Sequence, residues 1–128
     1  MEFPEGLKYT KDHEWVRLEG DTAVLGITEF AQNELGEIVF IDLPGPGRVV
    51  NQGDTLCVVE STKAASDVYA AIGGTVRESN PKLKDNPQLI NSSPYTDGWM
   101  VRLEKFSAAE AEKLMSAAQY REHLGSKV

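Results

Sequence analysis

Two apolar runs flank a turn of small and polar residues in the stretch Thr55-Leu56-Cys57-Val58-Val59-Glu60-Ser61-Thr62-Lys63-Ala64-Ala65-Ser66-Asp67-Val68-Tyr69-Ala70-Ala71-Ile72. Runs of this kind, with Gly73-Gly74 closing the second, are typical of two β-strands joined as a hairpin. Lys63 is therefore expected near the hairpin tip, where no bulky neighbour covers it. An amine presented in this way suits modification by an enzyme better than a role in a catalytic pocket.

Short strands separated by turn residues extend over most of the chain, which predicts a mainly β fold, a flattened β-barrel or sandwich. The segment Asn80–Gly98 holds three prolines and is expected to be a long ordered loop. The expected strands are Glu14–Leu18, Thr22–Thr28, Ile38–Leu43, Thr55–Glu60, Asp67–Ile72, Thr75–Ser79 and Met100–Lys105.

Two helices are predicted. A short internal helix occupies 28–36, with Thr28 as the N-cap and Gly36 as the C-terminal stop. A C-terminal helix begins after Ser107, which forms a capping-box pair with Glu110. It has an apolar stripe, expected to pack on the core, at Ala111, Leu114, Met115 and Ala118.

The length of 128 residues predicts one domain, with a β-rich body over 1–106 and the C-terminal helix over 107–124. The net charge of −7 is uneven, because residues 1–50 carry four Lys/Arg against ten Asp/Glu. Such acidity repels phosphate backbones, so nucleic acid is not an expected partner. No run approaches the roughly 18 apolar residues of a membrane span, so no membrane association is expected.

The sequence contains no catalytic or metal-binding pattern that we could identify. Cys57 is the single cysteine and lies in an apolar run, which favours a buried structural thiol in a reducing compartment. The segment Asp12-His13-Glu14 is a weak metal candidate, because neighbouring strand residues point to opposite faces. His123 is expected to be exposed on the last helix. No metal site is predicted.

The first residues, Met1-Glu2-Phe3-Pro4-Glu5, match neither a secretory signal nor an Arg-rich transit peptide. We therefore expect a bacterial cytoplasmic protein. The alternative is a mitochondrial matrix protein whose transit peptide has been removed.

The segment around the candidate lysine resembles a known modification site. Glu60-Ser61-Thr62-Lys63-Ala64, followed by Ser66-Asp67, is similar to the lipoylation site of the glycine cleavage system H protein family. The order of the similar segments makes the resemblance specific, which the lysine motif alone would not be. From Gly6 to Leu103 they are Lys8-Tyr9, His13-Glu14-Trp15-Val16, Gly26-Ile27-Thr28, Ala31-Gln32, Leu35-Gly36-Glu37-Ile38-Val39, Leu43-Pro44, Gly47, Val76, Asn80, Leu89-Ile90-Asn91, Pro94-Tyr95 and Gly98-Trp99-Met100.

The chain departs from the family pattern near the hairpin. Thr62 stands where many members carry Val, Ala71 where Pro is usual, and Gly73 where Ser or Ala is common. These changes concern the turn and the hairpin's exit, and they leave the acceptor amine and Glu60 in place.

The resemblance implies a lipoyl-carrier domain of the biotinyl/lipoyl type, with lipoate attached to Lys63 as an amide. Such a chain is a non-catalytic shuttle of glycine catabolism and one-carbon metabolism, and the cofactor does the chemistry. The implied partners are the pyridoxal-phosphate-dependent glycine decarboxylase, the tetrahydrofolate-dependent aminomethyltransferase, dihydrolipoamide dehydrogenase and a lipoylating enzyme. The family also implies a monomer outside its complexes.

The resemblance also implies roles for four carboxylates. Glu60 is the expected recognition residue for the lipoylating enzyme. Glu14 and Asp67 match positions of a surface cleft that holds the aminomethyl-loaded arm, and Asp12 is a third candidate there. Carboxylates suit a cationic aminomethyl group by simple Coulomb attraction.

Two other functions remain open from the sequence. A biotin carrier domain uses a similar hairpin, but its lysine is usually flanked by Met, and here Thr62 and Ala64 flank Lys63. The chain could also be a lipoyl relay or reservoir for 2-oxoacid dehydrogenase complexes. Stimulation of bicarbonate–glycine exchange by the decarboxylase would separate the shuttle from the relay.

Overall fold

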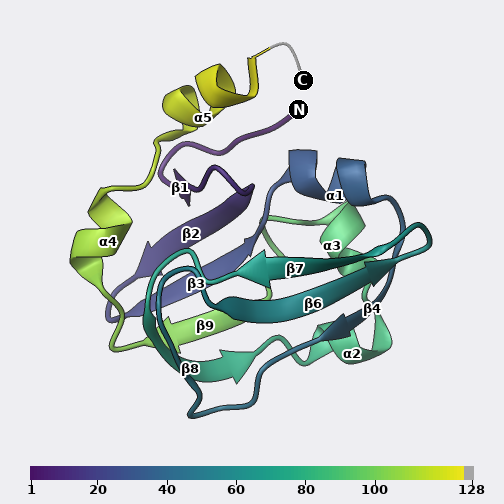
Figure 1. Ribbon diagram of the computed structural model, residues 1–128, viewed down its shortest axis with the longest axis horizontal. Helices are drawn as coiled ribbons and strands as arrows, with labels where there is room; N and C mark the ends of the chain where they lie inside the picture. The colour runs from purple at the N-terminus through teal and green to yellow at the C-terminus, as the bar shows by residue number, and fades with distance from the viewer. Residues whose placement is uncertain (126–128) are drawn as a thin grey trace.

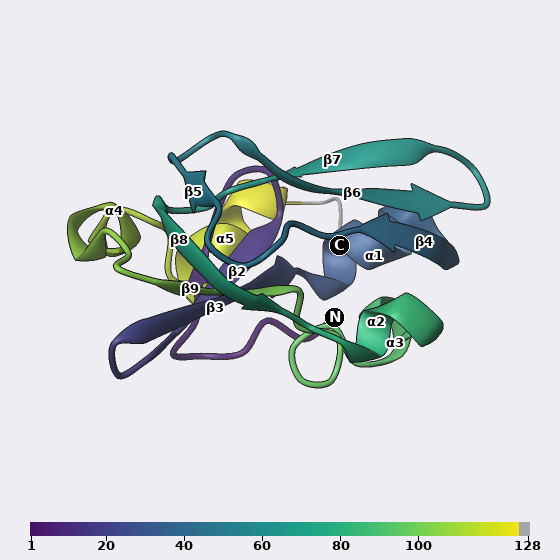
Figure 2. The same ribbon diagram turned by 90° about the horizontal axis from the view of Figure 1, so that it is seen from below.

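Two antiparallel β-sheets stack on each other in the computed structural model, which describes residues 1–125 (Figures 1 and 2). The larger sheet has the strand order β1-β2-β3-β9-β8-β5 and the smaller one β4-β6-β7. The predicted mainly β sandwich is therefore confirmed. Residues 126–128 of the expected 1–128 domain lie outside the described residues. The larger sheet comprises β1 (Lys8–Tyr9), β2 (Glu14–Glu19), β3 (Thr22–Ile27), β5 (Val49–Val50), β8 (Gly74–Ser79) and β9 (Val101–Glu104); the smaller one comprises β4 (Ile38–Asp42), β6 (Thr55–Ser61) and β7 (Ala65–Tyr69).

The predicted hairpin is strands β6 and β7, and its tip projects from the body of the molecule (Figure 1). Strand β7 ends at Tyr69 rather than at Ile72. The chain bends there because Ala70 pairs with the turn before β6: Ala70 N donates to Asp54 O at 2.8 Å, and Gly53 N donates to Ala70 O at 2.9 Å. The residues after the bend enter the core, since Ala70, Ala71 and Ile72 are buried.

The main core fills the space between the two sheets. Its side chains come from both, for example Leu25 and Leu103 from the larger sheet and Leu56 and Val59 from the smaller one. Strand β3 is buried at all six positions, because it is covered on both faces. The alternating apolar positions of the remaining strands supply the rest of this contact.

The short internal helix is confirmed as α1 (Glu29–Leu35). Thr28 is its N-cap, with Oγ1 accepting from Ala31 N at 3.2 Å, and Gly36 ends it at φ 82°. Strand β3 accordingly ends at Ile27, one residue before the predicted boundary.

The expected loop over 80–98 instead contains two short helices, α2 (Lys82–Asp85) and α3 (Leu89–Ser92). Leu83 and Ile90 anchor them in the core. Asn80 starts the segment by donating from Nδ2 to the carbonyl oxygens of Asp97 and Trp99. Tertiary packing of two apolar residues therefore outweighs the turn-rich composition.

The predicted C-terminal helix is present, but it is not continuous over 107–124: the segment forms α4 (Ala108–Glu112) and α5 (Ala117–Leu124). Met115 leaves helical geometry to pair with Tyr9 at the edge of the larger sheet, with N–O distances of 2.8 and 2.9 Å. Ser116 then starts α5 in a capping box with Gln119. Only half of the predicted Ser107–Glu110 capping box forms: Ser107 Oγ accepts from Glu110 N at 3.2 Å, whereas Glu110 Oε1 accepts from Gly73 N at 2.8 Å.

Helix α5 and the N-terminal segment pack together in a second core cluster, which is aromatic. Tyr120 stacks on Tyr9 with ring centroids 4.9 Å apart, and Phe3 meets Tyr120 edge-on at 5.1 Å. The break before α5 shifts the buried face, so Ala118 of the predicted stripe is exposed and Ala117 is buried in its place. No helix within residues 1–125 is long and apolar enough to cross a bilayer.

Gly26 lies opposite Trp15 on the paired strands β2 and β3. The buried indole of Trp15 leaves no room for a side chain at this position. Trp15 Nε1 donates to Ile27 O at 2.9 Å and to Pro94 O at 3.1 Å. A Cβ on Gly26 would lie 2.6 Å from the indole. We expect Gly26→Ala to lower the free energy of unfolding by about 1–3 kcal/mol, because the indole must move off both acceptors.

Urea unfolding followed by tryptophan fluorescence measures this loss. Gly45→Ala is the matched control, because a Cβ there meets nothing within 4 Å. Equal stability of the two variants would contradict the packing argument.

Candidate functional site

The tip of the β6–β7 hairpin is held by backbone hydrogen bonds rather than left loose. Ser61 N donates to Ala64 O at 2.9 Å, and Ser61 Oγ accepts from the backbone N–H groups of Lys63 and Ala64. Thr62 N donates to Glu37 O at 3.0 Å, which ties the tip to the loop between α1 and β4. The hydrogen bonds of Ser61 and Thr62 therefore fix the backbone at Lys63, and the conformational freedom of the site lies in the lysine side chain.

The loop that receives the hairpin tip is itself fixed by Asn91 of α3. Asn91 Nδ2 donates to Gly36 O at 2.8 Å and to Gln32 Oε1 at 2.9 Å. Its Oδ1 accepts from Ile38 N at 2.9 Å. Three hydrogen bonds from this amide thus span the turn from α1 into β4, a role that our sequence analysis did not assign.

The side chain of Lys63 is exposed and lies over the C-terminal end of α1. Its Nζ donates to Glu34 O at 3.0 Å, one of the carbonyls that a helix end leaves without an intrahelical partner. Among residues 1–125 Lys63 forms no ion pair. The expected exposed amine is confirmed, and its hydrogen bond to Glu34 O has to be released before it can react.

Gly36 leaves the space that this lysine occupies. A Cβ at Gly36 would stand 3.1 Å from Lys63 Cε, closer than nearly all real Cβ contacts. The φ of 82° at Gly36 also disfavours any L side chain. The C-cap of α1 therefore serves the lysine as well as the helix.

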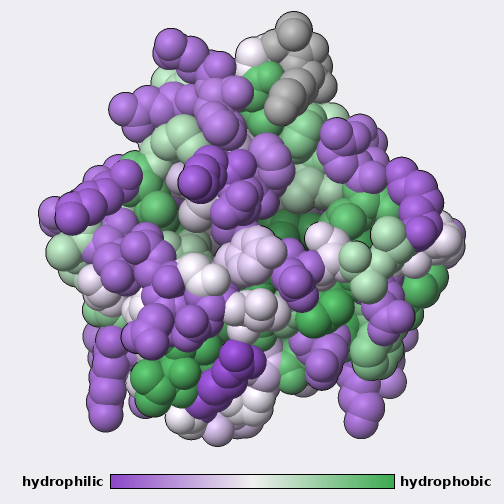
Figure 3. Space-filling view, in the orientation of Figure 1, coloured by the Kyte–Doolittle hydropathy of each residue, from purple (hydrophilic) through white to green (hydrophobic). Residues whose placement is uncertain are grey.

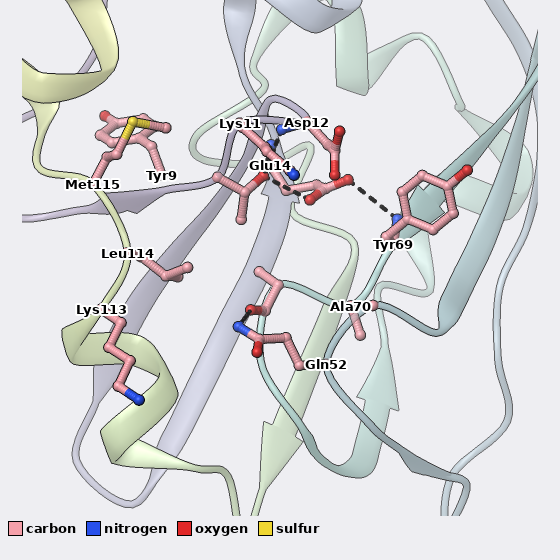
Figure 4. A pocket seen from close by; sticks show the side chains of 13 residues that line it. Tyr9, Lys11, Asp12, Glu14, Gln52, Tyr69, Ala70, Lys113, Leu114 and Met115 are labelled. Carbon is pink, nitrogen blue, oxygen red and sulfur yellow. Dashed lines mark hydrogen bonds between the residues drawn. The ribbon is translucent and has the colours of Figure 1, made fainter. Parts of the chain in front are cut away.

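A cleft of about 380 Å³ opens where β7 ends, beside β1, β2 and the segment after α4 (Figure 4). Glu14 lies at its floor and is only 4% exposed. Its Oε1 accepts from Thr10 Oγ1 at 2.7 Å and its Oε2 from Tyr69 N at 3.2 Å. The apolar wall comes from Tyr9, Leu114 and Met115, with Lys113 at the outer end.

Burial raises the pKa of Glu14 to about 7. The two hydrogen bonds from Thr10 and Tyr69 oppose this shift, and the nearby charge of Asp12 adds to it. The desolvated carboxylate is thus half ionised near neutrality, and a cation placed in the cleft would restore its charged form.

The other predicted cleft residues behave differently. Asp12 lines the cleft, whereas Asp67 does not. Asp67 is exposed on β7, two residues before Tyr69. Lys11 and Lys113 line the cleft without having been predicted, and no local pattern in the sequence marks them. The structure therefore brings together Asp12 and Glu14, and leaves Asp67 on a neighbouring surface.

Strand β7 connects the lysine to the cleft. Lys63 lies two residues before its first residue, and Tyr69 is its last. At about 3.3 Å per residue, the six steps from Lys63 to Tyr69 span roughly 20 Å. A long flexible group on Lys63 would have to lie back along the hairpin and α1 to reach Glu14.

The remaining chemical candidates are structural. Cys57 is buried, and burial raises the pKa of its thiol to about 12, so it stays protonated. The ring of His13 packs on Phe30 of α1, with Nδ1 2.8 Å from the hydroxyl of Tyr120 in α5. No group of three potential metal ligands occurs within residues 1–125. His123 is exposed, as predicted.

The raised pKa of Glu14 predicts a pH-dependent stability. The folded carboxyl binds its proton more tightly than the unfolded one, so the free energy of unfolding falls as pH rises from about 4.5 to about 7. We expect Glu14→Gln to remove up to about 3 kcal/mol of this fall. The glutamine amide has one acceptor oxygen where the carboxylate has two. The loss of one acceptor lowers the free energy of unfolding by the same amount at every pH, so it does not change the slope.

Urea unfolding between pH 4 and pH 8 measures the two slopes. Glu5→Gln, at an exposed position, is the control for removing one carboxylate. Parallel curves for wild type and Glu14→Gln would show that Glu14 is ionised normally.

Comparisons with known proteins agree with this geometry. The profile of the family described as glycine cleavage H-protein matches residues 7–127. The chain is 50% identical over 125 residues to the glycine cleavage system H protein of Staphylococcus saprophyticus, covering 98% of this chain and 99% of that one. It is 47% identical over 124 residues to that of Halothermothrix orenii, covering 97% of each.

A solved structure supports the same assignment. The crystal structure of a glycine cleavage system H protein from Mycobacterium marinum superposes with a TM-score of 0.86 at 34% identity. It covers 96% of this chain and 99% of that one. A profile match over nearly the whole sequence, together with full-length relatives, shows that this chain belongs to the glycine cleavage H-protein family.

Proposed function

We propose that this chain is the lipoyl-bearing shuttle of the glycine cleavage system, a single non-catalytic carrier domain in the bacterial cytoplasm. It carries an aminomethyl group from glycine decarboxylase to the tetrahydrofolate-dependent aminomethyltransferase, and dihydrolipoamide dehydrogenase then reoxidises it. The observation that carries the proposal is the amine of Lys63, exposed at the tip of a fixed hairpin. The bacterial origin of the relatives is in keeping with the proposed compartment.

The residues at the hairpin fit a lipoyl amide. Gly36 leaves room beside Lys63 Cε, and an amide N–H at Nζ can keep the hydrogen bond to Glu34 O that the ammonium donates. When bound, lipoate supplies a dithiolane that can be reduced, loaded and reoxidised. Lys63 would hold it covalently, and the fixed backbone of Ser61–Ala64 would give the arm a constant point of attachment.

The cleft fits the cationic end of a loaded arm. Glu14 would pair with the ammonium, while Thr10 and Tyr69 hold the carboxylate in place. Asp12 would add negative charge at the rim. Tyr9, Leu114 and Met115 would exclude water from the apolar part of the arm. We assign Asp67 a smaller part than Glu14, because it does not line the cleft.

Lys63→Arg tests the attachment site. Arginine keeps the positive charge but provides no amine that forms the lipoyl amide. We expect the variant to gain no lipoyl mass in a lipoylating host and to support no bicarbonate–glycine exchange with purified decarboxylase.

Intact-mass spectrometry and the exchange assay give the two readouts, and a biotin arm would be seen by avidin capture. Lys84→Arg, at another exposed lysine, is the control and should behave as wild type. Exchange that survives Lys63→Arg would refute the shuttle, and a lipoylated wild type without exchange would favour the relay.

Glu14→Gln tests the cleft. Because one charge-assisted contact is lost, we expect the loaded arm to release its aminomethyl group to buffer about tenfold faster or more at pH 8. Wild type should approach the rate of the variant only well below pH 7, because the bound cation lowers the pKa of Glu14 from its raised value and the carboxylate is protonated later.

Release of formaldehyde and ammonia from the loaded protein measures this rate. Asp67→Asn is the comparison, and we expect a smaller effect because Asp67 lies outside the cleft. A larger effect of Asp67→Asn than of Glu14→Gln would place the cationic group on the outer surface instead.

A further inference from the structure

Two large apolar side chains lie side by side in water on strand β4. Val39 is 47% exposed and Phe40 is 53% exposed. A β-bulge between Ile38 and Phe40 is the cause, because Ile38 pairs with Ser61 and Phe40 with Glu60, which leaves Val39 as the extra residue. In a regular strand with Ile38 inward, Phe40 would also point inward. The bulge turns it outward, a device that proteins use to re-aim a side chain near a functional site.

The register of the small sheet places these residues in an ordered outer face. One row across the sheet is Phe40, Glu60 and Ala65, and the next is Asp42, Val58 and Asp67. Figure 3, which looks onto this face, shows apolar atoms over β4 and β6 next to polar ones. We call the six residues of these rows, with Val39, the outer face of the hairpin sheet.

This face is acidic around its apolar residues. It carries the exposed carboxylates of Asp42, Glu60 and Asp67. Glu34 and Glu37, also exposed, lie beside the hairpin tip, as the contacts of Lys63 Nζ and Thr62 N with their carbonyls show. A complementary surface would offer an apolar pocket with basic side chains around it.

We propose that the outer face of the hairpin sheet is the docking surface of the enzyme that acylates Lys63, with Phe40 as the anchor. This rests on the proposed function. The enzyme would have a pocket for the Phe40 ring and basic residues facing Glu60 and Asp67. Its contact with β4 is through side chains, because the bulge interrupts the regular edge to which another strand would pair.

Geometry favours the acylating enzyme over the enzymes of glycine cleavage. The unmodified amine is only one lysine side chain away from the hairpin backbone, so an enzyme that reaches it must cover the hairpin. The cleavage enzymes meet the end of a long arm and can act at a distance from this face. Glu60 is three residues before Lys63 and directly opposite Phe40, so the anchor and the acceptor belong to one rigid unit.

The reaction that this docking serves is an acyl transfer. The Lys63 ammonium first loses a proton. The resulting amine forms the amide bond to the carbonyl carbon of an activated acid, an acyl adenylate or thioester. The bond from that carbon to its activating group breaks, and the second proton of the nitrogen leaves with that group or passes to a base.

Phe40→Ser tests the anchor, in the full-length protein lacking lipoate. We measure kcat/KM for lipoylation by a purified lipoate–protein ligase with lipoate and ATP. Loss of a buried aromatic anchor is expected to lower kcat/KM by about tenfold or more, mainly through KM. Leu18→Ser is the matched control, because Leu18 is 48% exposed but lies on β2 of the other sheet, and it should leave kcat/KM unchanged.

Two further measurements separate the outcomes. The thermal unfolding midpoint should be the same for both variants, which excludes misfolding as the cause of slower lipoylation. Phe40→Ser that has been fully lipoylated by long incubation, as judged by intact mass, should support bicarbonate–glycine exchange as well as wild type does.

Each other result overturns the assignment. Equal lipoylation of Phe40→Ser and wild type removes the anchor while the proposed function stands. If Phe40→Ser is lipoylated normally but its exchange is impaired, the outer face binds the decarboxylase instead. If wild type is a dimer that Phe40→Ser dissociates without slowing lipoylation, the outer face binds a second copy of the chain. A wild type that is never lipoylated at Lys63 defeats the proposed function, and this inference with it.

Discussion

The hydrogen bond from Thr62 N to Glu37 O ties the hairpin tip to the body of the protein, and the geometry of the site depends on it. An unattached tip of a two-stranded hairpin would fray, because such hairpins are marginal by themselves. Asn91 completes the support, since its amide holds Gly36 O and Ile38 N on either side of Glu37. A side chain on α3 thus determines where a lysine on a distant hairpin is held.

The cleft shows the opposite use of burial. Lys63 remains in water and is not desolvated, whereas burial of Glu14 raises the pKa of its carboxyl to about 7. Thr10 and Tyr69 offset only part of the desolvation. A buried charge with incomplete compensation is costly without a partner and favourable with one. An ammonium beside Glu14 would supply that partner, which is the physical reason for proposing a cation in this cleft.

The sequence predicts the local features of this fold well. The hairpin, the N-cap at Thr28 and the stop at Gly36 follow from residue types at neighbouring positions, and the structure has all three. It could not show features that depend on distant partners. The break before α5 exists because Met115 pairs with Tyr9, and nothing near Met115 in the sequence signals that bond. Asn91 stood within the family resemblance, but its role requires the folded turn from α1 to β4.

The bulge in β4 lies between these two cases. The run Ile38-Val39-Phe40-Ile41 is apolar throughout, so it has no alternation that shows which side chains face the core. Such a run predicts a fully buried strand. Only the pairing with β6 shows the register shift at Val39, which leaves both Val39 and Phe40 exposed.

The two sides of β7 then serve different needs. Its backbone N–H at Tyr69 holds Glu14 in the cleft, while its side chain at Asp67 lies on the outer face. The cleft and the outer face are therefore separate surfaces that share one strand.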